Sequence, residues 1–278
     1  MHNFNLTDET FDVNQSSNYF LLMQSSLDGF SYAVCDTVRN KCILLKHFET
    51  KSFDWFEYKN FLLTVIESDP NLKLHYKGSV HILNQKDFTL VPEEYLPQKQ
   101  EDVQSYFPGS TGNLISSSSK LLNSAILCPY SPILQETLLK SFPGVKLTHV
   151  VLPFSCNLIT ESSRTLRHVF HFTIHRGFMI AGVAHSAKPD FINSFKAETY
   201  EEILYYIVQV LDKFKVAPSL AEIYIQNSTG IQDLHNRLQT YIGKVRNLKA
   251  SHGMVYSYIF TEDVMERFAN LLNLYHCE

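Results

Sequence analysis

Apolar residues in the first half of the chain gather in short runs that are separated by turn residues and by helical patterns. Runs at 19–25 and 30–35 flank a turn at Asp28-Gly29, and a third run covers 41–48. Their length and their content of β-branched and aromatic residues are typical of strands. We therefore expect a three-strand meander at the start of the fold.

A helix is predicted directly after this meander. Trp55, Leu62 and Ile66 recur at helical spacing, and Ser52 precedes them as a candidate N-cap. Further signals complete the first half: strands or extended segments at 79–83, 88–92, 124–128 and 145–151, and a helix over 132–141. This alternation of strands and helices favours an α/β fold.

The second half repeats the same order of elements. Runs near 168–175, 178–185 and 190–195 predict a second meander, and Thr199-Tyr-Glu-Glu202 matches a capping box at the start of a helix. Further elements follow: strands at 220–226 and 244–248, and helices over 231–241 and 261–275. We expect two lobes of related design.

The spacing between corresponding features is nearly constant. Gly29 and Gly177 are 148 positions apart, and Ser52 and Thr199 are 147 positions apart. Internal similarity with matched turns and caps predicts a duplication. Two unrelated α/β domains with the same order of elements would give a similar pattern, so that alternative stays open.

The composition fits a packed protein of two lobes. With 278 residues, 45% of them hydrophobic and 19% charged, the chain exceeds the usual size of a single core and is not disordered. We predict a polar leader at 1–18, a first lobe at 19–164 and a second lobe at 165–278. The serine-rich stretch at 109–123 is expected to be a flexible loop or hairpin.

The charge and the cysteine content limit which classes of partner and which cellular compartment we expect. Lys and Arg (24) are outnumbered by Asp and Glu (28), which gives a net charge of -4 and argues against a nucleic-acid partner. We expect neither a secretory leader nor a membrane span, although peripheral association through a partner stays open. Five cysteines without a Cys-x-x-Cys pair suit reduced thiols and a cytoplasmic location.

A meander followed by helix and strand, present twice, resembles the superfamily of actin, sugar kinases and heat-shock chaperones. More narrowly, the chain resembles an uncharacterised bacterial family with an actin-like ATPase fold, from about residue 19 to 275. The residues that carry this likeness are Ser26-Leu-Asp-Gly-Phe-Ser31, Phe88-Thr-Leu-Val-Pro92, Phe142-Pro143, and Asn193-Ser-Phe195 with Thr199. The resemblance implies an α/β fold with duplicated actin-like (ribonuclease H-like) lobes, each a mixed sheet with an N-terminal three-strand meander and flanking helices.

The resemblance also implies where a nucleotide site would lie. In the superfamily each hairpin turn cradles phosphates, and an acidic residue beside the turn holds hydrated magnesium or positions water. Here Asp28 directly adjoins Gly29 without the usual spacer, and Asp-Gly is also a favoured hairpin turn in its own right. The second turn has no carboxylate, although Arg176 beside Gly177 suits an anion.

A third turn corresponds to the adenosine-binding turn of the superfamily. Asn227-Ser-Thr229-Gly230 supplies one glycine instead of a pair, and it serves equally well as a helix N-cap. The resemblance thus implies a remnant nucleotide cleft formed by six residues: Asp28, Gly29, Arg176, Gly177, Thr229 and Gly230. We expect no catalytic residue, no efficient ATPase activity and no cofactor, with ATP and magnesium as the alternative.

Other constellations give weaker signals. In a strand, His168 faces away from His171 and His175, so a metal site is not expected. The chain has no Gly-x-Ser-x-Gly and no phosphate loop ending in Gly-Lys-Ser/Thr.

By analogy with the pilus-assembly members of the superfamily, we predict a non-catalytic interaction or scaffold module with protein partners. The alternatives are a nucleotide-binding ATPase or kinase-type phosphotransferase with displaced site residues, and a small-molecule sensor that uses the cleft.

Overall fold

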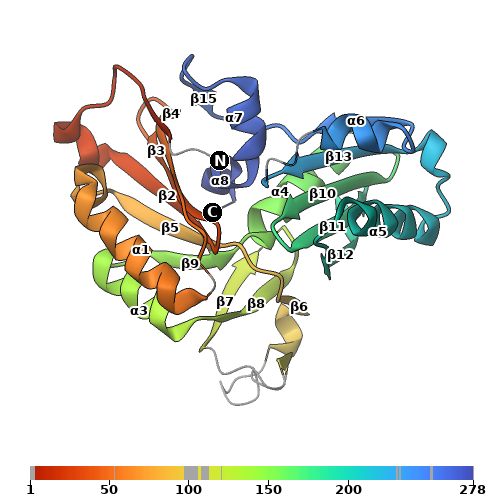
Figure 1. Ribbon diagram of the computed structural model, residues 1–278, viewed down its shortest axis with the longest axis horizontal. Helices are drawn as coiled ribbons and strands as arrows, with labels where there is room; N and C mark the ends of the chain where they lie inside the picture. The colour runs from red at the N-terminus through yellow and green to blue at the C-terminus, as the bar shows by residue number, and fades with distance from the viewer. Residues whose placement is uncertain are drawn as a thin grey trace.

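The computed structural model describes residues 4–52, 54–96, 106–107, 113–119, 121–229, 231, 233–250 and 253–277. Two β-sheets stand side by side with a layer of helices between them, and further helices cover the outer face of each sheet (Figure 1). Apolar clusters fill the space between these layers. The predicted two-lobed α/β fold is confirmed.

The first sheet combines the N-terminal meander with strands from distant parts of the chain. Strands β2, β3 and β4 are antiparallel, and β5 and β9 extend the sheet in parallel. In spatial order the strands are β1 (Phe4–Thr7), β4 (Lys41–Glu49), β3 (Gly29–Asp36), β2 (Tyr19–Ser26), β5 (Gly78–Leu83) and β9 (Lys146–His149), with β15 (Val255–Tyr256) also paired to β4.

The second sheet repeats this order without the additional edge strands. Its strands are β12 (Lys188–Lys196), β11 (Phe178–His185), β10 (Val169–His175), β13 (Glu222–Asn227) and β14 (Lys244–Asn247). In both sheets the first strand of the meander lies at the centre, and the last two strands run parallel to it. Parallel strands end at the same edge, so each meander's first turn projects toward the space between the lobes.

Outer helices bury one apolar face each. Tyr58, Leu62 and Leu134 pack beneath the first sheet, and Ile203 and Ile207 pack beneath the second. The helices are α1 (Trp55–Ser68) and α3 (Pro132–Ser141) on the first lobe, and α5 (Tyr200–Lys213) and α6 (Leu234–Gln239) on the second. Short 3-10 turns connect the elements: η1 (Val13–Asn18), η2 (Pro70–Lys73), η3 (Glu93–Tyr95), η5 (Pro218–Leu220) and η6 (Leu274–His276).

The central layer contains a helix that the sequence pattern did not reveal. Helix α4 (Val151–Ser162) is buried on nearly every side because it packs between the two sheets. It therefore lacks the polar stripe that marks a surface helix. Pro153 lies in its first turn, where a missing N–H does not interrupt the helix.

Elements from both chain ends contact the first sheet, namely β1 and α8 (Ala269–Asn273), whereas α7 (Glu262–Arg267) packs against β13 of the second sheet. Residues 4–7 of the expected polar leader form β1 on β4, since Phe4 and Leu6 pack against the central core. Both C-terminal helices fall within the predicted second lobe. Helix α8 packs against β2, β3 and α4, because its apolar residues complete the layer between the sheets.

A small third sheet includes residues 113–119 of the serine-rich stretch. Its strands are β6 (Thr89–Pro92), β8 (Ser124–Tyr130) and β7 (Asn113–Ser119), and β7 and β8 form an antiparallel hairpin. Residues 109–112 and 120 of the stretch lie outside the described residues.

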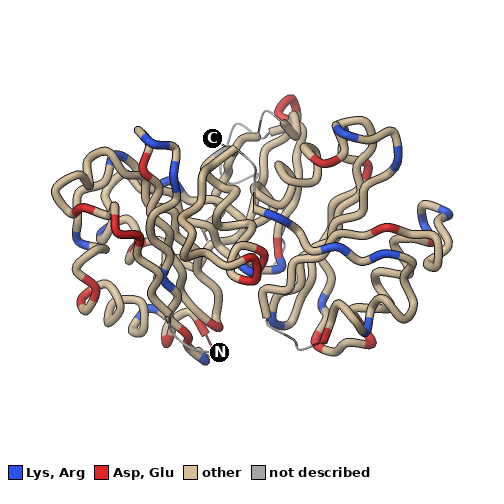
Figure 2. Tube along the Cα trace, turned by 90° about the horizontal axis from the view of Figure 1, so that it is seen from above, with Lys and Arg blue, Asp and Glu red and all other residues tan. Residues whose placement is uncertain are grey.

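Across the described parts of both lobes, basic and acidic residues are interspersed along the trace (Figure 2). Among these residues no helix is long and apolar enough to cross a membrane.

The helix caps show how far the two lobes correspond. Thr199 forms the predicted capping box with Glu202, whereas the N-cap of α1 is Asp54, whose carboxylate accepts from two backbone N–H groups. Asp54 and Thr199 are 145 positions apart, whereas Gly29 and Phe178, the first residues of β3 and β11, are 149 apart. The lobes thus share their strand order but not a constant residue spacing.

Candidate functional site

A cleft with a volume of about 730 Å³ lies between the lobes, at the point where the two meander turns approach each other. Asp28 of the first turn and Arg176 and Gly177 of the second line it. Three of the six predicted site residues therefore meet at one cavity.

The first turn is built differently from the prediction. Ser26 pairs with Gly29 across the hairpin, so the turn consists of Leu27 and Asp28, and Gly29 is already part of β3. The Ser26 hydroxyl donates to the Asp28 carboxylate. Gly29 has no positive φ, but a Cβ there would lie 2.7 Å from Cε1 of His47. The absence of a side chain at Gly29 thus allows the imidazole of His47 to pack closely against the backbone. Gly29 is not among the described residues that line the cleft.

The second turn matches the prediction more closely. His175 pairs with Phe178, and Gly177 has φ +82°, a conformation that only glycine adopts readily. Arg176 at the tip lines the cleft. The imidazole of His175 stacks on Phe178 at 4.6 Å between ring centroids. Burial, and to a lesser degree the neighbouring His149, lowers the pKa of His175 to about 3, so its ring is neutral.

The third turn contributes less than predicted. Thr229 donates from its hydroxyl to Oδ1 of Asn227 (2.8 Å), and the backbone N–H of Ile231 donates to the same oxygen (3.3 Å). Thr229 therefore closes a local turn, and its neighbour Ser228 is the residue that lines the cleft. Thr229 does not cap α6, which begins after Asp233. Gly230 lies outside the described residues.

A contact between the two ends of the chain forms one wall of the cleft. Nη2 of Arg267 lies 3.3 Å from Nε2 of His47, and Oγ of Ser31 lies 2.9 Å from Nδ1 of the same ring. A guanidinium only donates, so Nε2 accepts and Nδ1 carries the proton that is donated to Ser31. Burial, followed by the Arg267 charge, lowers the pKa of His47 to about 4. His47 in this state does not act as a base toward Ser31.

Two buried polar atoms of the cleft make no hydrogen bond among the described residues. They are Oδ1 of Asn84, which follows β5, and Nε2 of His175. Both side chains are more than nine-tenths buried. A buried polar atom normally has a partner, so these two favour a polar ligand in the cleft.

The charges of the cleft are mixed. Three cationic side chains and three carboxylates line it: Lys86, Arg176, Arg267, Asp28, Asp87 and Glu198. Lys86 and Asp87 neutralise each other at 3.0 Å on the surface. Within the described part of the chain, no group of three or more His, Cys, Asp or Glu side chains is placed to hold a metal ion. The arrangement suits hydrogen bonding to a polar or anionic group.

A buried chain of hydrogen bonds supports the first turn from below. Nε2 of His81 lies 2.7 Å from the Ser25 hydroxyl, and the Tyr130 hydroxyl lies 2.7 Å from Nδ1 of His81. The Tyr58 hydroxyl donates to the carbonyl of Gly29 (3.2 Å). Burial lowers the pKa of His81 to about 3. These polar groups therefore stabilise the turn and do not face the cleft.

Sequence reasoning did not identify the cleft residues that depend on long-range contacts. His47 of β4 and Arg267 at the end of α7 meet only through the tertiary fold, and Asn84 is an isolated polar residue at a strand end. Of the predicted histidines, His171 and His175 are buried on the central side of β10, while His168 lies 3.7 Å from Asp190. The position after a central strand was the one available signal, and it would have suggested Asn84.

Several solved structures have a similar architecture. A Bacteroides thetaiotaomicron protein with actin-like ATPase fold and unknown function is similar, with a TM-score of 0.78, 17% identity, and coverage of 97% of this chain and 100% of that chain. The type IV pilus biogenesis complex PilM–PilN is similar with a TM-score of 0.56, 10% identity, and coverage of 93% and 98%. The ethanolamine utilization protein EutJ from Carboxydothermus hydrogenoformans is similar with a TM-score of 0.53 and 7% identity, and the match covers 94% of this chain and 89% of that chain.

These identities are low, so the likeness concerns the fold alone. The search of curated proteins finds no match to the chain. One family model, described as protein of unknown function (DUF3822), matches residues 8–245. Because that match spans well over half of the chain, the protein belongs to the DUF3822 family, and its fold is that of the actin-like ATPases.

Proposed function

We propose that the protein is a non-catalytic member of the actin-like fold that serves as an interaction module in the cytoplasm. One observation carries the proposal, namely the chemistry of the two turns that meet at the cleft. The Asp28 carboxylate accepts a hydrogen bond from Ser26, and the second turn contributes His175 and Arg176 in place of an acid. Phosphoryl transfer depends on acids that position magnesium and water. Of the two turns only the first carries a carboxylate, Asp28, and it is already engaged by Ser26.

The residues of the cleft do not fit a magnesium nucleotide. Mg²⁺ requires oxygen ligands in near-octahedral geometry, and it is usually held by carboxylates together with phosphates. Arg176 and Arg267 line the same cavity as Asp28 and would repel a divalent cation. The cleft is therefore not expected to transfer a phosphoryl group from magnesium ATP.

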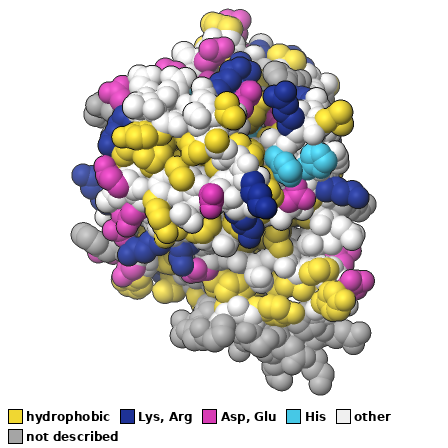
Figure 3. Space-filling view, turned by 90° about the vertical axis from the view of Figure 1, so that its right-hand side faces the viewer, with side chains coloured by type: hydrophobic (Ala, Val, Ile, Leu, Met, Phe, Trp, Pro, Cys, Tyr) yellow, Lys and Arg dark blue, Asp and Glu magenta, His cyan; other side chains and the backbone are white. Residues whose placement is uncertain are grey.

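Two features favour an interaction role. The chain has the fold found in the PilM–PilN complex, which is an assembly of two proteins. Large apolar side chains are also exposed on the second lobe, with Leu166 88% and Leu220 84% accessible. On the face shown in Figure 3, apolar side chains lie among charged ones. We further infer that the common strand order of the two sheets reflects an internal duplication of an ancestral lobe.

Two measurements test this proposal. Purified protein should hydrolyse ATP and GTP no faster than the variant Arg176→Met, with or without magnesium. The tagged protein, purified from its native cell, should retain one partner at constant stoichiometry through size-exclusion chromatography. Turnover that the Arg176→Met variant loses would overturn the non-catalytic assignment, and a purely monomeric native protein would overturn the interaction role.

A second candidate function is nucleotide binding by displaced residues, as in an ATPase or kinase-type phosphotransferase. It is favoured by the unpartnered Oδ1 of Asn84 and Nε2 of His175 beside Arg176. A nucleotide at about 100 times its Kd should raise the unfolding free energy by about 2.7 kcal/mol. A higher unfolding midpoint with ATP that is absent in Asn84→Leu would establish this candidate, and an unchanged midpoint would exclude it.

A further inference from the structure

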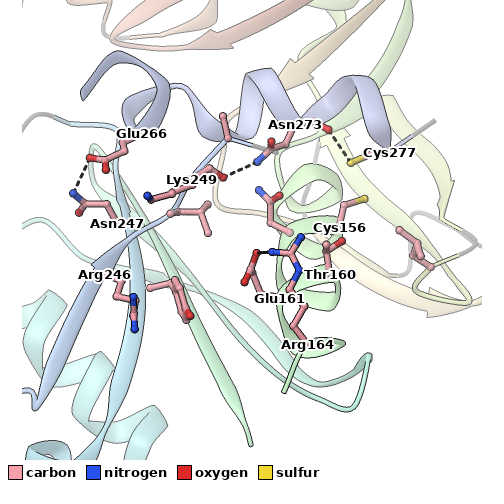
Figure 4. A pocket seen from close by; sticks show the side chains of 15 residues that line it. Cys156, Thr160, Glu161, Arg164, Arg246, Asn247, Lys249, Glu266, Asn273 and Cys277 are labelled. Atoms are coloured by element: carbon pink, nitrogen blue, oxygen red, sulfur yellow. Dashed lines mark hydrogen bonds and ion pairs between the residues drawn. The ribbon is translucent and has the colours of Figure 1, made fainter. Parts of the chain in front are cut away.

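A second cavity lies on another side of the central helices and shares no residue with the interlobe cleft. Its volume is about 430 Å³, which suits a small organic ligand. Helix α4 forms one wall, and the end of β14 with residues 248–250 forms the other (Figure 4). The helices α7 and α8 close it above in this view.

The floor of this cavity is mainly apolar and carries one uncompensated donor. Cys156, Leu248 and Ala250 line it, and each is less than a tenth exposed. Among them lies Nδ2 of Asn157 on α4, a buried atom that has no hydrogen-bond partner among the described residues. A buried amide N–H without an acceptor is unfavourable, so this position favours a ligand that brings an oxygen acceptor.

The rim carries more positive than negative charge. Arg164, just after the end of α4, and Arg246 of β14 lie on opposite sides of the cavity (Figure 4). Each makes an ion pair with one carboxylate, Glu161 and Glu222 respectively, which leaves further guanidinium N–H groups available. Lys249 is exposed on the rim, and its ammonium makes no ion pair within the described residues.

The acidic residues of the lining do not oppose an anion strongly. Glu161 already accepts from Arg164, and Glu266 accepts from Nδ2 of Asn247 at 2.7 Å. Burial, and then the neighbouring Asp263, raises the pKa of the Glu266 carboxyl, while the hydrogen bond from Asn247 opposes this shift. The donors thus outnumber the acceptors that remain available to a ligand.

We propose that this cavity binds a small organic acid whose apolar body carries an oxygen acceptor. The body lies on the floor formed by Cys156 and Leu248, and its acceptor takes the free N–H of Asn157. The carboxylate lies at the rim, where Lys249 and the two arginines attract it. Nothing in this site requires a nucleotide or a metal, so it is independent of the function proposed for the cleft.

A fluorinated probe tests each part of this assignment. The compound 4-(4-fluorophenyl)-4-oxobutanoate carries an aromatic body, a ketone acceptor and a carboxylate, and ¹⁹F NMR reports its binding directly. Its primary amide lacks the charge, and 4-(4-fluorophenyl)butanoate lacks the ketone. We expect saturable binding of the keto acid, and binding of each analogue weaker by about tenfold, as the loss of one good polar contact predicts.

Matched variants locate the probe in this cavity. Asn157→Leu and Lys249→Met should each weaken binding of the keto acid by about tenfold, while Arg176→Met in the interlobe cleft should leave it unchanged. Asn157→Leu should fold with an equal or higher unfolding midpoint, because it removes a buried donor that has no partner. Failure of the keto acid to bind, or equal binding to the wild type and both cavity variants, would overturn the proposal.

Discussion

Five buried histidines should make the protein sensitive to mild acid. Burial is the main cause that lowers their pKa values, to about 4 for His47 and His149 and to about 3 for His81, His171 and His175. In the unfolded chain each ring takes up a proton near pH 6.5. The unfolded state therefore binds more protons than the folded state below that pH, and stability falls as the pH falls from about 7 toward 4.

The size of this effect follows from the pKa differences. Each histidine loses about 1.4 kcal/mol of stabilisation per pH unit below 6.5, which is about 2 kcal/mol at pH 5. Five such residues together remove about 10 kcal/mol, and the whole unfolding free energy of a typical domain is about 5–15 kcal/mol. We therefore expect cooperative acid unfolding with a midpoint between about pH 6 and pH 4, the lower limit applying to a stability of about 15 kcal/mol.

Guanidinium denaturation followed by the fluorescence of Trp55, the single tryptophan, measures this loss at each pH. His171 is the best residue to vary, because it is fully buried and neither ring nitrogen has a partner among the described residues. The free energy of unfolding is expected to differ between about pH 7.5 and pH 5, and the variant His171→Leu should make this difference smaller by about 2 kcal/mol. His75→Asn, at an exposed position, is the control. Equal stability of the wild type at both pH values would refute the reasoning.

Three backbone and capping substitutions should lower the free energy of unfolding, as measured by chemical denaturation. Gly29→Ala should remove about 1–3 kcal/mol, because the new Cβ would lie 2.7 Å from Cε1 of His47 and 2.9 Å from the carbonyl oxygen of Phe48; no loss would contradict close packing at this position. Gly177→Ala should remove about 1 kcal/mol through its φ of +82° alone, and Gly177→Asn should remove less. Thr199→Ala should remove about 1 kcal/mol while Thr199→Ser keeps the capping box, and equal losses in both would contradict the role of its hydroxyl.

The features that the sequence predicted correctly depend on local chemistry. The hairpin of residues 19–35, helix α3 and the capping box at Thr199 are each encoded within a few adjacent residues. The second turn was located for the same reason, because Gly177 must adopt a positive φ. Local signals of this kind need no knowledge of the rest of the chain.

The features that the sequence did not reveal depend on the environment that the fold creates. Helix α4 has no polar face because it packs between two sheets, and the approach of Arg267 to His47 joins residues from opposite ends of the chain. Gly29 was interpreted as a turn glycine, but its small size matters because His47 lies beside it. Contacts between residues that are far apart in the chain cannot be predicted from a single sequence.

One short helix joins the two cavities of this molecule. Glu266 lines the second cavity, while the next two residues, Arg267 and Phe268, line the interlobe cleft. Successive residues of a helix point about 100° apart, so a modest rotation of α7 about its axis would move all three side chains at once. A displacement of this helix would therefore change one wall of each cavity at the same time, whereas substitutions elsewhere in either lining would act on one cavity alone.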